Sequence, residues 1–165
     1  MQAPRRVAWI ADHCVQEMQR EADRTFPLET GGVLIGYWAD SQTDVVVVDV
    51  VGPGPAAQHT PATFLPDAAH HEKVVAQAYK RSDRRHVYLG DWHSHPLPGH
   101  DALSRRDRQT LHHIGRAAAA RMPTPIMALL VRSEAAWDLR TWALRATRFS
   151  LQLRSPIESL AIRRF

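Results

Sequence analysis

The feature that most constrains the fold of this chain is a pair of histidines followed by a proline. His93 and His95 are separated by one residue, and Pro96 comes next. Residues i and i+2 of a β-strand project to the same side, so the two imidazoles can reach one ion. Proline lacks an N–H and confines the residue before it to an extended conformation, so Pro96 ends the strand. The pair therefore predicts a strand that carries two metal-ligating side chains to its end.

A helix start follows and supplies a carboxylate. Ser104 is a good N-cap, and Asp107 falls in the first turn of the helix that it begins. Ser104-x-x-Asp107 is also the pattern of a capping box, which needs no role beyond helix stability. Two imidazoles and a carboxylate give zinc three protein ligands and leave the fourth position to water, as in catalytic sites. The conjunction with His93 and His95 favours a metal site.

Three segments, taken in order, carry a resemblance to a known family. They are Glu29-Thr30-Gly31-Gly32-Val33-Leu34-Ile35-Gly36, then His93-Ser94-His95-Pro96, then Ser104-Arg105-Arg106-Asp107. Together they resemble the JAMM/MPN-plus metalloproteases in their prokaryotic JAB branch, from the first helix to about Leu144. The resemblance implies the JAB1/MPN fold, an α/β architecture with a mixed, curved β-sheet flanked by helices, of the cytidine-deaminase-like kind.

The resemblance also implies roles for five residues. The family's two histidines and aspartate bind zinc, which implies His93, His95 and Asp107 as the ligands of one zinc ion per chain. Its upstream glutamate holds and deprotonates the zinc water, which implies that role for Glu29. Its serine helps to stabilise the tetrahedral intermediate, which implies that role for Ser104.

One departure from the family concerns the loop between the histidine pair and the helix, which is one residue longer than usual. The longer loop makes His100 and Asp101 alternatives to Asp107 as the third ligand. Asp107 is favoured because it keeps its spacing to Ser104, and the segment Leu97-Pro98-Gly99 is a loop in which an insertion is easily absorbed.

The function implied by the resemblance is a zinc-dependent peptidase or isopeptidase. Its substrate is the amide bond after the C-terminal glycines of a ubiquitin-like protein, in a conjugate or a precursor. The resemblance further implies E1-like and E2-like proteins as partners encoded beside such an enzyme, and a setting in either antiphage defence or sulfur-carrier processing. The alternative is a noncatalytic MPN-type scaffold that binds a protein partner and has lost the metal or uses it structurally.

Composition limits the number of domains, the possible disulfides and zinc sites, and the expected location of the protein. A chain of 165 residues with 44% hydrophobic content suits one domain over residues 1–165. The single cysteine, Cys14, excludes an internal disulfide and lies on an apolar helix face, so we expect it in the core. Without a Pro-Cys-x-x-Cys element, a zinc nucleobase deaminase is disfavoured. Neither a membrane-spanning run nor a signal peptide is evident, so we expect a cytoplasmic protein.

The basic charge has two interpretations. The net charge is +4 and the isoelectric point about 9.8, which invites a nucleic-acid hypothesis. The arginines are dispersed without interleaved aromatic residues, however, and this is typical of a solvated surface. Arg105, Arg106 and Arg108, beside the predicted metal, are suited to an acidic substrate.

Hydrophobic periodicity predicts the remaining elements. We expect strands at 33–38, 45–51, 64–65, 86–92, 126–131, 137–144 and 149–153, and helices at 7–22, from Asp67, at 104–122 and in the tail 157–165. The first two long strands should pair antiparallel. The segment 52–61 is a mobile flap or a rigid turn, and its two early prolines favour the turn. His70, His71, His112 and His113 are interpreted as incidental to the site.

Overall fold

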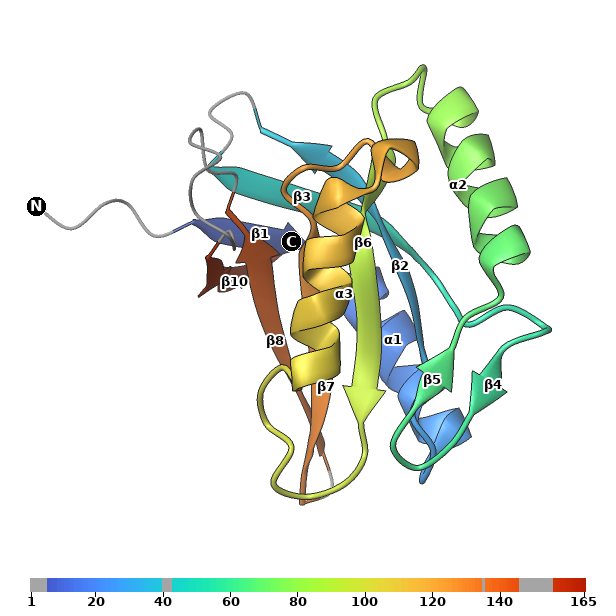
Figure 1. Ribbon diagram of the computed structural model, residues 1–165, viewed down its shortest axis with the longest axis vertical. Coiled ribbons are helices and arrows are strands. Elements are labelled where there is room, and N and C mark those ends of the chain that lie inside the picture. Colours follow the sequence, from blue (N-terminus) through green and yellow to red (C-terminus); the bar gives the residue numbers. More distant parts are fainter. Residues whose placement is uncertain (1–5, 40–42, 135, 146–155) are drawn as a thin grey trace, which may run out of the picture.

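The computed structural model describes residues 6–39, 43–134, 136–145 and 156–165 (Figure 1). The helices are α1 (Asp12–Thr25), α2 (Ala68–Arg81) and α3 (Arg105–Arg116), and a 3₁₀ turn η1 spans Ala118–Ala120. The strands are β1 (Val7–Ile10), β2 (Gly31–Trp38), β3 (Asp44–Val51), β4 (Gln58–His59), β5 (Phe64–Leu65), β6 (Val87–His95), β7 (Ile126–Ser133), β8 (Ala136–Leu144), β9 (Ile157–Ser159) and β10 (Ala161–Arg164).

Eight of these strands form one mixed sheet in the order β10-β1-β3-β2-β6-β7-β8-β9, and β4 and β5 form a separate pair. Only Leu160 separates β9 from β10, yet β9 pairs with β8 and β10 pairs with β1 at the other end of the strand order. Leu160 is buried, and its N–H donates a 2.9 Å hydrogen bond to the carbonyl of Thr141. The last segment therefore links both edges, and the sheet curves until it is nearly closed, as the expected fold requires.

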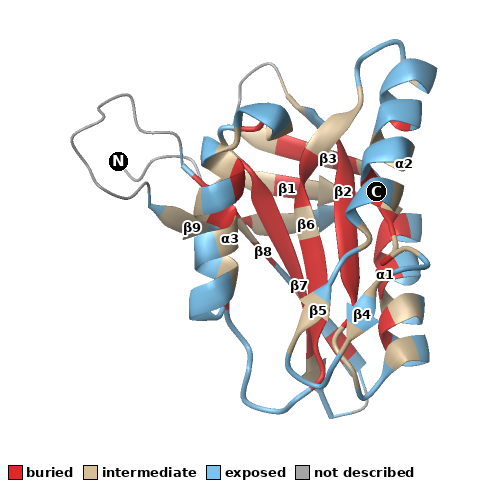
Figure 2. Cartoon of the chain, turned by 45° about the vertical axis from the view of Figure 1, so that its right-hand side comes forward, coloured by how far each residue is buried: buried red, intermediate tan, exposed pale blue. Residues whose placement is uncertain are grey.

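The helices cover the two faces of this sheet (Figures 1 and 2). On one face, α1 buries Cys14, Val15 and Met18 in the main core, together with residues of the central strands. The expectation that Cys14 belongs to the core is confirmed, and burial raises the pKa of its thiol to about 12. The other face is covered by α2 and α3.

The two helices on that second face pack at different places. Ala78 of α2 lies in a cluster with Val33 and Ile35 of β2. Leu111 of α3 packs with Met127 of β7. The carboxyl end of β6, which carries the histidine pair, lies near the start of α3 and the β4–β5 pair (Figure 1).

The start of the chain differs from the expected helix over 7–22. Val7–Ile10 is strand β1, which pairs in parallel with both β3 and β10, and Ala8 and Ile10 are its fully buried residues. The apolar residues Val7 and Ile10 fit a helical spacing, but their neighbours on both sides are strands with unpaired backbone groups. Backbone hydrogen bonds to β3 and β10 therefore make this segment a strand. Helix α1 begins only at Asp12.

Two further expectations, for the tail and for the end of α3, were wrong. The tail forms β9 and β10 instead of a helix because its backbone completes the ladders of both sheet edges. Helix α3 ends at Arg116 instead of residue 122, since Ala117 leaves the helical region (φ −73°, ψ 110°). The strand expected at 149–153 lies outside the described residues. The other strands are confirmed, including the antiparallel pairing of β2 with β3.

Among the helices of the described ranges, none combines the length and hydrophobicity needed to cross a membrane.

Candidate metal centre

Strand β6 places both histidines on the sheet face that α2 and α3 cover. His93 and His95 are buried, and they pair in register with Leu129 and Val131 of the parallel neighbour β7. On the other side, His93 faces Gly31 of β2. A Cβ atom at Gly31 would lie 2.3 Å from the carbonyl oxygen of Trp92, so only glycine allows the two strands to approach this closely. The Gly-Gly pair thus serves close packing beside the site.

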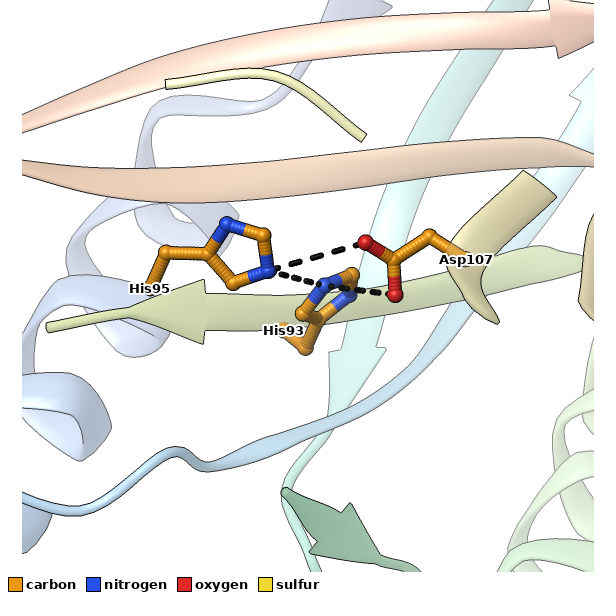
Figure 3. Close-up of side chains that lie close together, drawn as sticks. All are labelled: His93, His95 and Asp107. Atoms are coloured by element: carbon orange, nitrogen blue, oxygen red, sulfur yellow. Dashed lines mark hydrogen bonds and ion pairs between the residues drawn. The ribbon is translucent and has the colours of Figure 1, made fainter. Parts of the chain in front are cut away.

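The first turn of α3 brings Asp107 to the same point (Figure 3). Its Oδ1 lies 3.3 Å from His93 Nε2, and its Oδ2 lies 3.6 Å from His95 Nε2. The two Nε2 atoms are 3.1 Å apart. The side chain of Asp107 is only 14% exposed. One atom from each of the three side chains therefore converges on one small volume, as the sequence predicted.

These distances fit a tetrahedral zinc. Ligand atoms about 2.0–2.1 Å from the ion, at tetrahedral angles, lie roughly 3.3–3.4 Å from each other. The separations of 3.1 Å between the imidazole nitrogens and 3.3 Å between His93 and Asp107 are close to that value. The donor set is one that zinc accepts.

Ser104 and Asp107 form a complete capping box. The N–H of Asp107 donates to Oγ of Ser104 at 3.2 Å, and the N–H of Ser104 donates to Oδ2 of Asp107 at 2.7 Å. Burial alone would raise the pKa of the Asp107 carboxyl, but hydrogen bonds from His93 and Ser104 outweigh burial and hold that pKa well below its usual range. Asp107 is therefore an ionised carboxylate that caps the helix and faces the histidines at once.

A hydrogen bond on the far side of the His95 ring fixes its tautomer. His95 Nδ1 lies 2.9 Å from the backbone carbonyl of His100, which can only accept, so Nδ1 carries the proton. The lone pair is left on Nε2, which faces Asp107 and His93. Burial and the neighbouring His93 lower the pKa of His95, which favours the neutral ring that a metal needs. No sequence pattern indicates this carbonyl, because it acts through the backbone.

The longer loop does not bring either alternative ligand into the cluster. Asp101 is exposed, and Arg140 of β8 donates to its carboxylate at 3.1 Å and to its carbonyl at 2.7 Å. The His100 side chain is exposed as well, while its carbonyl supports His95. Within the described residues, the only group of three or more metal-ligating side chains is His93, His95 and Asp107.

Glu29 lies at the same site, just before β2. It lines a pocket of about 440 Å³ together with the three clustered side chains. Its N–H donates to the carbonyl of Thr60 at 2.8 Å, and its own carbonyl lies 2.8 Å from Nδ1 of His59. Burial raises the pKa of the Glu29 carboxyl to about 7, with the Asp107 charge adding to the rise and His93 opposing it. A carboxyl whose pKa is near 7, beside three candidate metal ligands, is suited to act as a general base.

Other residues around the pocket were not recognised from the sequence. Ser94, between the histidines, points the other way, and its Oγ accepts a 3.0 Å hydrogen bond from the N–H of Thr30, which fixes the residue next to Glu29. His71 was expected on a helix surface, but it is buried, lines the pocket and contacts the carbonyl of Gly52 at 2.8 Å. It is not one of the clustered ligands. Neither residue belongs to a pattern with a fixed spacing.

Comparison with known proteins agrees with this geometry. The family model described as prokaryotic homologues of the JAB domain matches residues 11–145. The "Probable metalloprotease y4qB" of Sinorhizobium fredii is 35% identical over 146 residues, which are 88% of this chain and 88% of that protein. The "CD-NTase/cGAS isopeptidase" of Vibrio cholerae is 37% identical over 68 residues, 41% of this chain and 42% of that protein.

A solved structure supports the fold alone. The solution structure of a protein from Desulfitobacterium hafniense aligns with a TM-score of 0.67 at 18% identity, and the alignment covers 96% of this chain and 92% of that one. The family match spans most of the chain and includes β6 and the start of α3. The chain therefore belongs to the prokaryotic JAB family, the branch of the JAMM/MPN group that its motifs resemble.

Proposed function

We propose that this protein is a zinc-dependent peptidase or isopeptidase that hydrolyses the amide bond after the C-terminal glycines of a ubiquitin-like protein. The observation that carries the proposal is the convergence of Glu29 with His93, His95 and Asp107 in one pocket. The names of two relatives, a probable metalloprotease and an isopeptidase, support hydrolysis of an amide bond.

The metal ligands in this proposal are His93, His95 and Asp107. The three side chains are two buried imidazoles and an ionised carboxylate, and all three line the pocket that a substrate would enter. Zinc held there supplies a bound water of lowered pKa, about 7, and polarises the scissile carbonyl. The capping box and the His100 carbonyl hold two of the three ligands in place.

The acid–base work falls to Glu29. Its pKa of about 7 lets the carboxylate accept a proton from the attacking water and later deliver that proton to the leaving amine. Burial provides this tuning, because a fully solvated glutamate is too weak a base at neutral pH. Hydrogen bonds between Thr30 and Ser94 hold the segment that carries Glu29 against β6, and hence near the histidines.

Ser104 is placed to stabilise the oxyanion. Its Oγ already accepts a hydrogen bond from the N–H of Asp107, so its own hydroxyl hydrogen remains to be donated into the pocket that it lines. Oxyanion-hole donors of this kind contribute about 3–4 kcal/mol to lowering the barrier.

The walls of the pocket suit an extended tail with small residues at the scissile bond. Phe64 and Leu65 of β5 line one side and Leu97 the loop side, and Leu65 and Leu97 are both exposed. The short β4–β5 pair supplies backbone groups beside the metal, where an extended peptide can add as a strand. Glycines next to the cleaved bond leave room for the backbone to approach the metal.

The test is Glu29→Gln, with Glu72→Gln on the exposed side of α2 as the matched control. The substrates are ubiquitin-like proteins encoded in the same genome, each extended at its C-terminal glycines by a reporter. We expect Glu29→Gln to keep about one zinc per chain and to lose cleavage, whereas Glu72→Gln cleaves normally. If Glu29→Gln cleaves as the wild type does, Glu29 is not the base. If the zinc-loaded wild type binds these proteins and cleaves none, the noncatalytic scaffold is the better hypothesis.

A further inference from the structure

A second hollow, of about 770 Å³, lies on the outer side of α3 beside β9, where the helix surface is exposed (Figure 2). We call it the α3 groove. Its lining residues are Arg105, Arg108, Gln109, His112, His113, Arg116 and Ile157. Three arginines and two histidines line it, and none of its described lining residues is acidic. The groove is thus concave and strongly basic.

Two arginines of the α3 groove, Arg105 and Arg108, form no ion pair within the described ranges, unlike many other arginines of those ranges. Several arginines elsewhere in the described ranges form ion pairs with a carboxylate: Arg6, Arg20, Arg24, Arg132, Arg140 and Arg164. Arg105 and Arg108 have no such carboxylate among the described residues. The one acidic residue of α3 is Asp107, whose carboxylate faces the histidines. An anionic group from outside is the partner that this charge lacks.

The α3 groove adjoins the metal pocket. Arg105 and Arg108 line the groove, while Arg106 and Asp107, from the same turn of α3, line the pocket. One helical turn rises about 5.4 Å, so a chain leaving the groove reaches the pocket around the start of the helix. A folded protein bound in the α3 groove is consequently positioned so that its extended tail can enter the metal pocket.

We propose that the α3 groove docks an acidic face of the protein substrate while its tail occupies the metal pocket. From Arg105 to Arg116 the basic side chains are spread over the 12 residues of α3, about 16 Å along the helix, which matches a helix or strand of a small folded protein. A nucleic acid is disfavoured because none of the described residues that line the groove is an aromatic side chain of the Phe, Tyr or Trp type on which a base stacks well. The inference rests on the proposed function in taking the ligand to be a substrate.

Binding alone tests the docking surface. The probe is a fluorescein-labelled twelve-residue peptide of alternating glutamate and alanine, and its affinity is measured by fluorescence anisotropy at two salt concentrations. We compare the wild type with Arg105→Glu/Arg108→Glu and with Lys80→Glu/Arg81→Glu, a control that makes the same charge change at the exposed end of α2. We expect the α3 variant to bind at least tenfold more weakly than the wild type, and the control to bind within about twofold of it.

Three results would overturn the proposal: no binding by the wild type, equal losses in the two double variants, or tighter binding of a heptathymidylate with six phosphates through the same arginines. The last result would assign the groove to nucleic acid. Docking as proposed uses the arginines of the groove and not the metal or Glu29, so peptide binding should persist in Glu29→Gln and in metal-free protein, and a failure of docking and a failure of catalysis are seen separately. Where a cleaved substrate is in hand, the α3 variant should raise KM and leave kcat unchanged.

Discussion

The backbone N–H of Ser104 donates a 2.7 Å hydrogen bond to Oδ2 of Asp107, while Oδ1 of the same carboxylate lies 3.3 Å from His93 Nε2. The side chain of Asp107 therefore belongs both to the capping box and to the group of candidate metal ligands. The capping box expected for Ser104-x-x-Asp107 is confirmed, and its carboxylate also faces the histidines, as the metal-site hypothesis requires. The helix start that the cap stabilises is also what holds the carboxylate toward the histidines.

Ser104 has two roles in this account, as N-cap of α3 and as oxyanion donor, and variants of Ser104 can separate their effects on stability and on activity. Ser104→Ala removes the side-chain cap, and we expect a loss of about 1 kcal/mol in the free energy of unfolding. It also removes the proposed oxyanion donor, and kcat should fall by about 10²–10³. Ser104→Gly should cost only a few tenths of a kcal/mol but lose as much activity. Denaturant titration and single-substrate kinetics measure the two effects, and full activity in either variant would remove Ser104 from the mechanism.

The close approach of β2 to β6 predicts a second pair of variants. In Gly31→Ala the new methyl group meets the Trp92 carbonyl oxygen at 2.3 Å, so the strands must separate beside His93. We expect a loss of about 1–3 kcal/mol in unfolding free energy and weaker zinc binding. Gly52→Ala is the control, because nothing lies within 4 Å of its added methyl group. Equal thermal stability of the two variants would show that the strand spacing is not constrained at Gly31.

The raised pKa of Glu29 predicts a pH dependence in the metal-free protein. The native carboxyl titrates at about 7 and the ordinary value is 4.5, so between these values the folded protein holds a proton that the unfolded chain releases. The contribution of Glu29 to stability is therefore greatest below pH 4.5 and is lost as the pH rises through 7.

Melting temperatures of metal-free wild type and Glu29→Gln, compared from pH 4.5 to 8, measure this contribution. The wild type should lose stability relative to the variant as the pH rises. Burial of His95 lowers its pKa and acts in the opposite direction, but His95 is present in both proteins and cancels in the comparison. Parallel curves would mean that the Glu29 carboxyl is not desolvated.

Much of the site was predictable because it follows from local rules. The strand ending at Pro96 and the cap at Ser104 are short-range patterns, and the structure brings His93, His95 and Asp107 together as expected. Glu29 is distant in sequence from them, and the resemblance to a family was needed to associate it with the site. The structure places it in the same pocket.

What could not be predicted depends on partners remote in sequence. Val7–Ile10 and the tail became strands because each completes the other's hydrogen bonds, from Val7 with Ala161 to Ile10 with Arg164. No local periodicity reports a pairing across more than 150 residues. The His100 carbonyl that orients His95 is likewise invisible in a sequence, since every residue carries a carbonyl and only the loop conformation aims this one.

The measurement that tests the central claim most directly is the metal content of the purified protein by mass spectrometry. It compares the wild type with Asp107→Ala and Asp101→Ala, two carboxylates of the same region of which only Asp107 faces the histidines. We predict about one zinc per chain in the wild type and in Asp101→Ala, and loss of zinc in Asp107→Ala. No zinc in the wild type after zinc has been supplied, or zinc retained in Asp107→Ala and lost in Asp101→Ala, would contradict the metal centre described above.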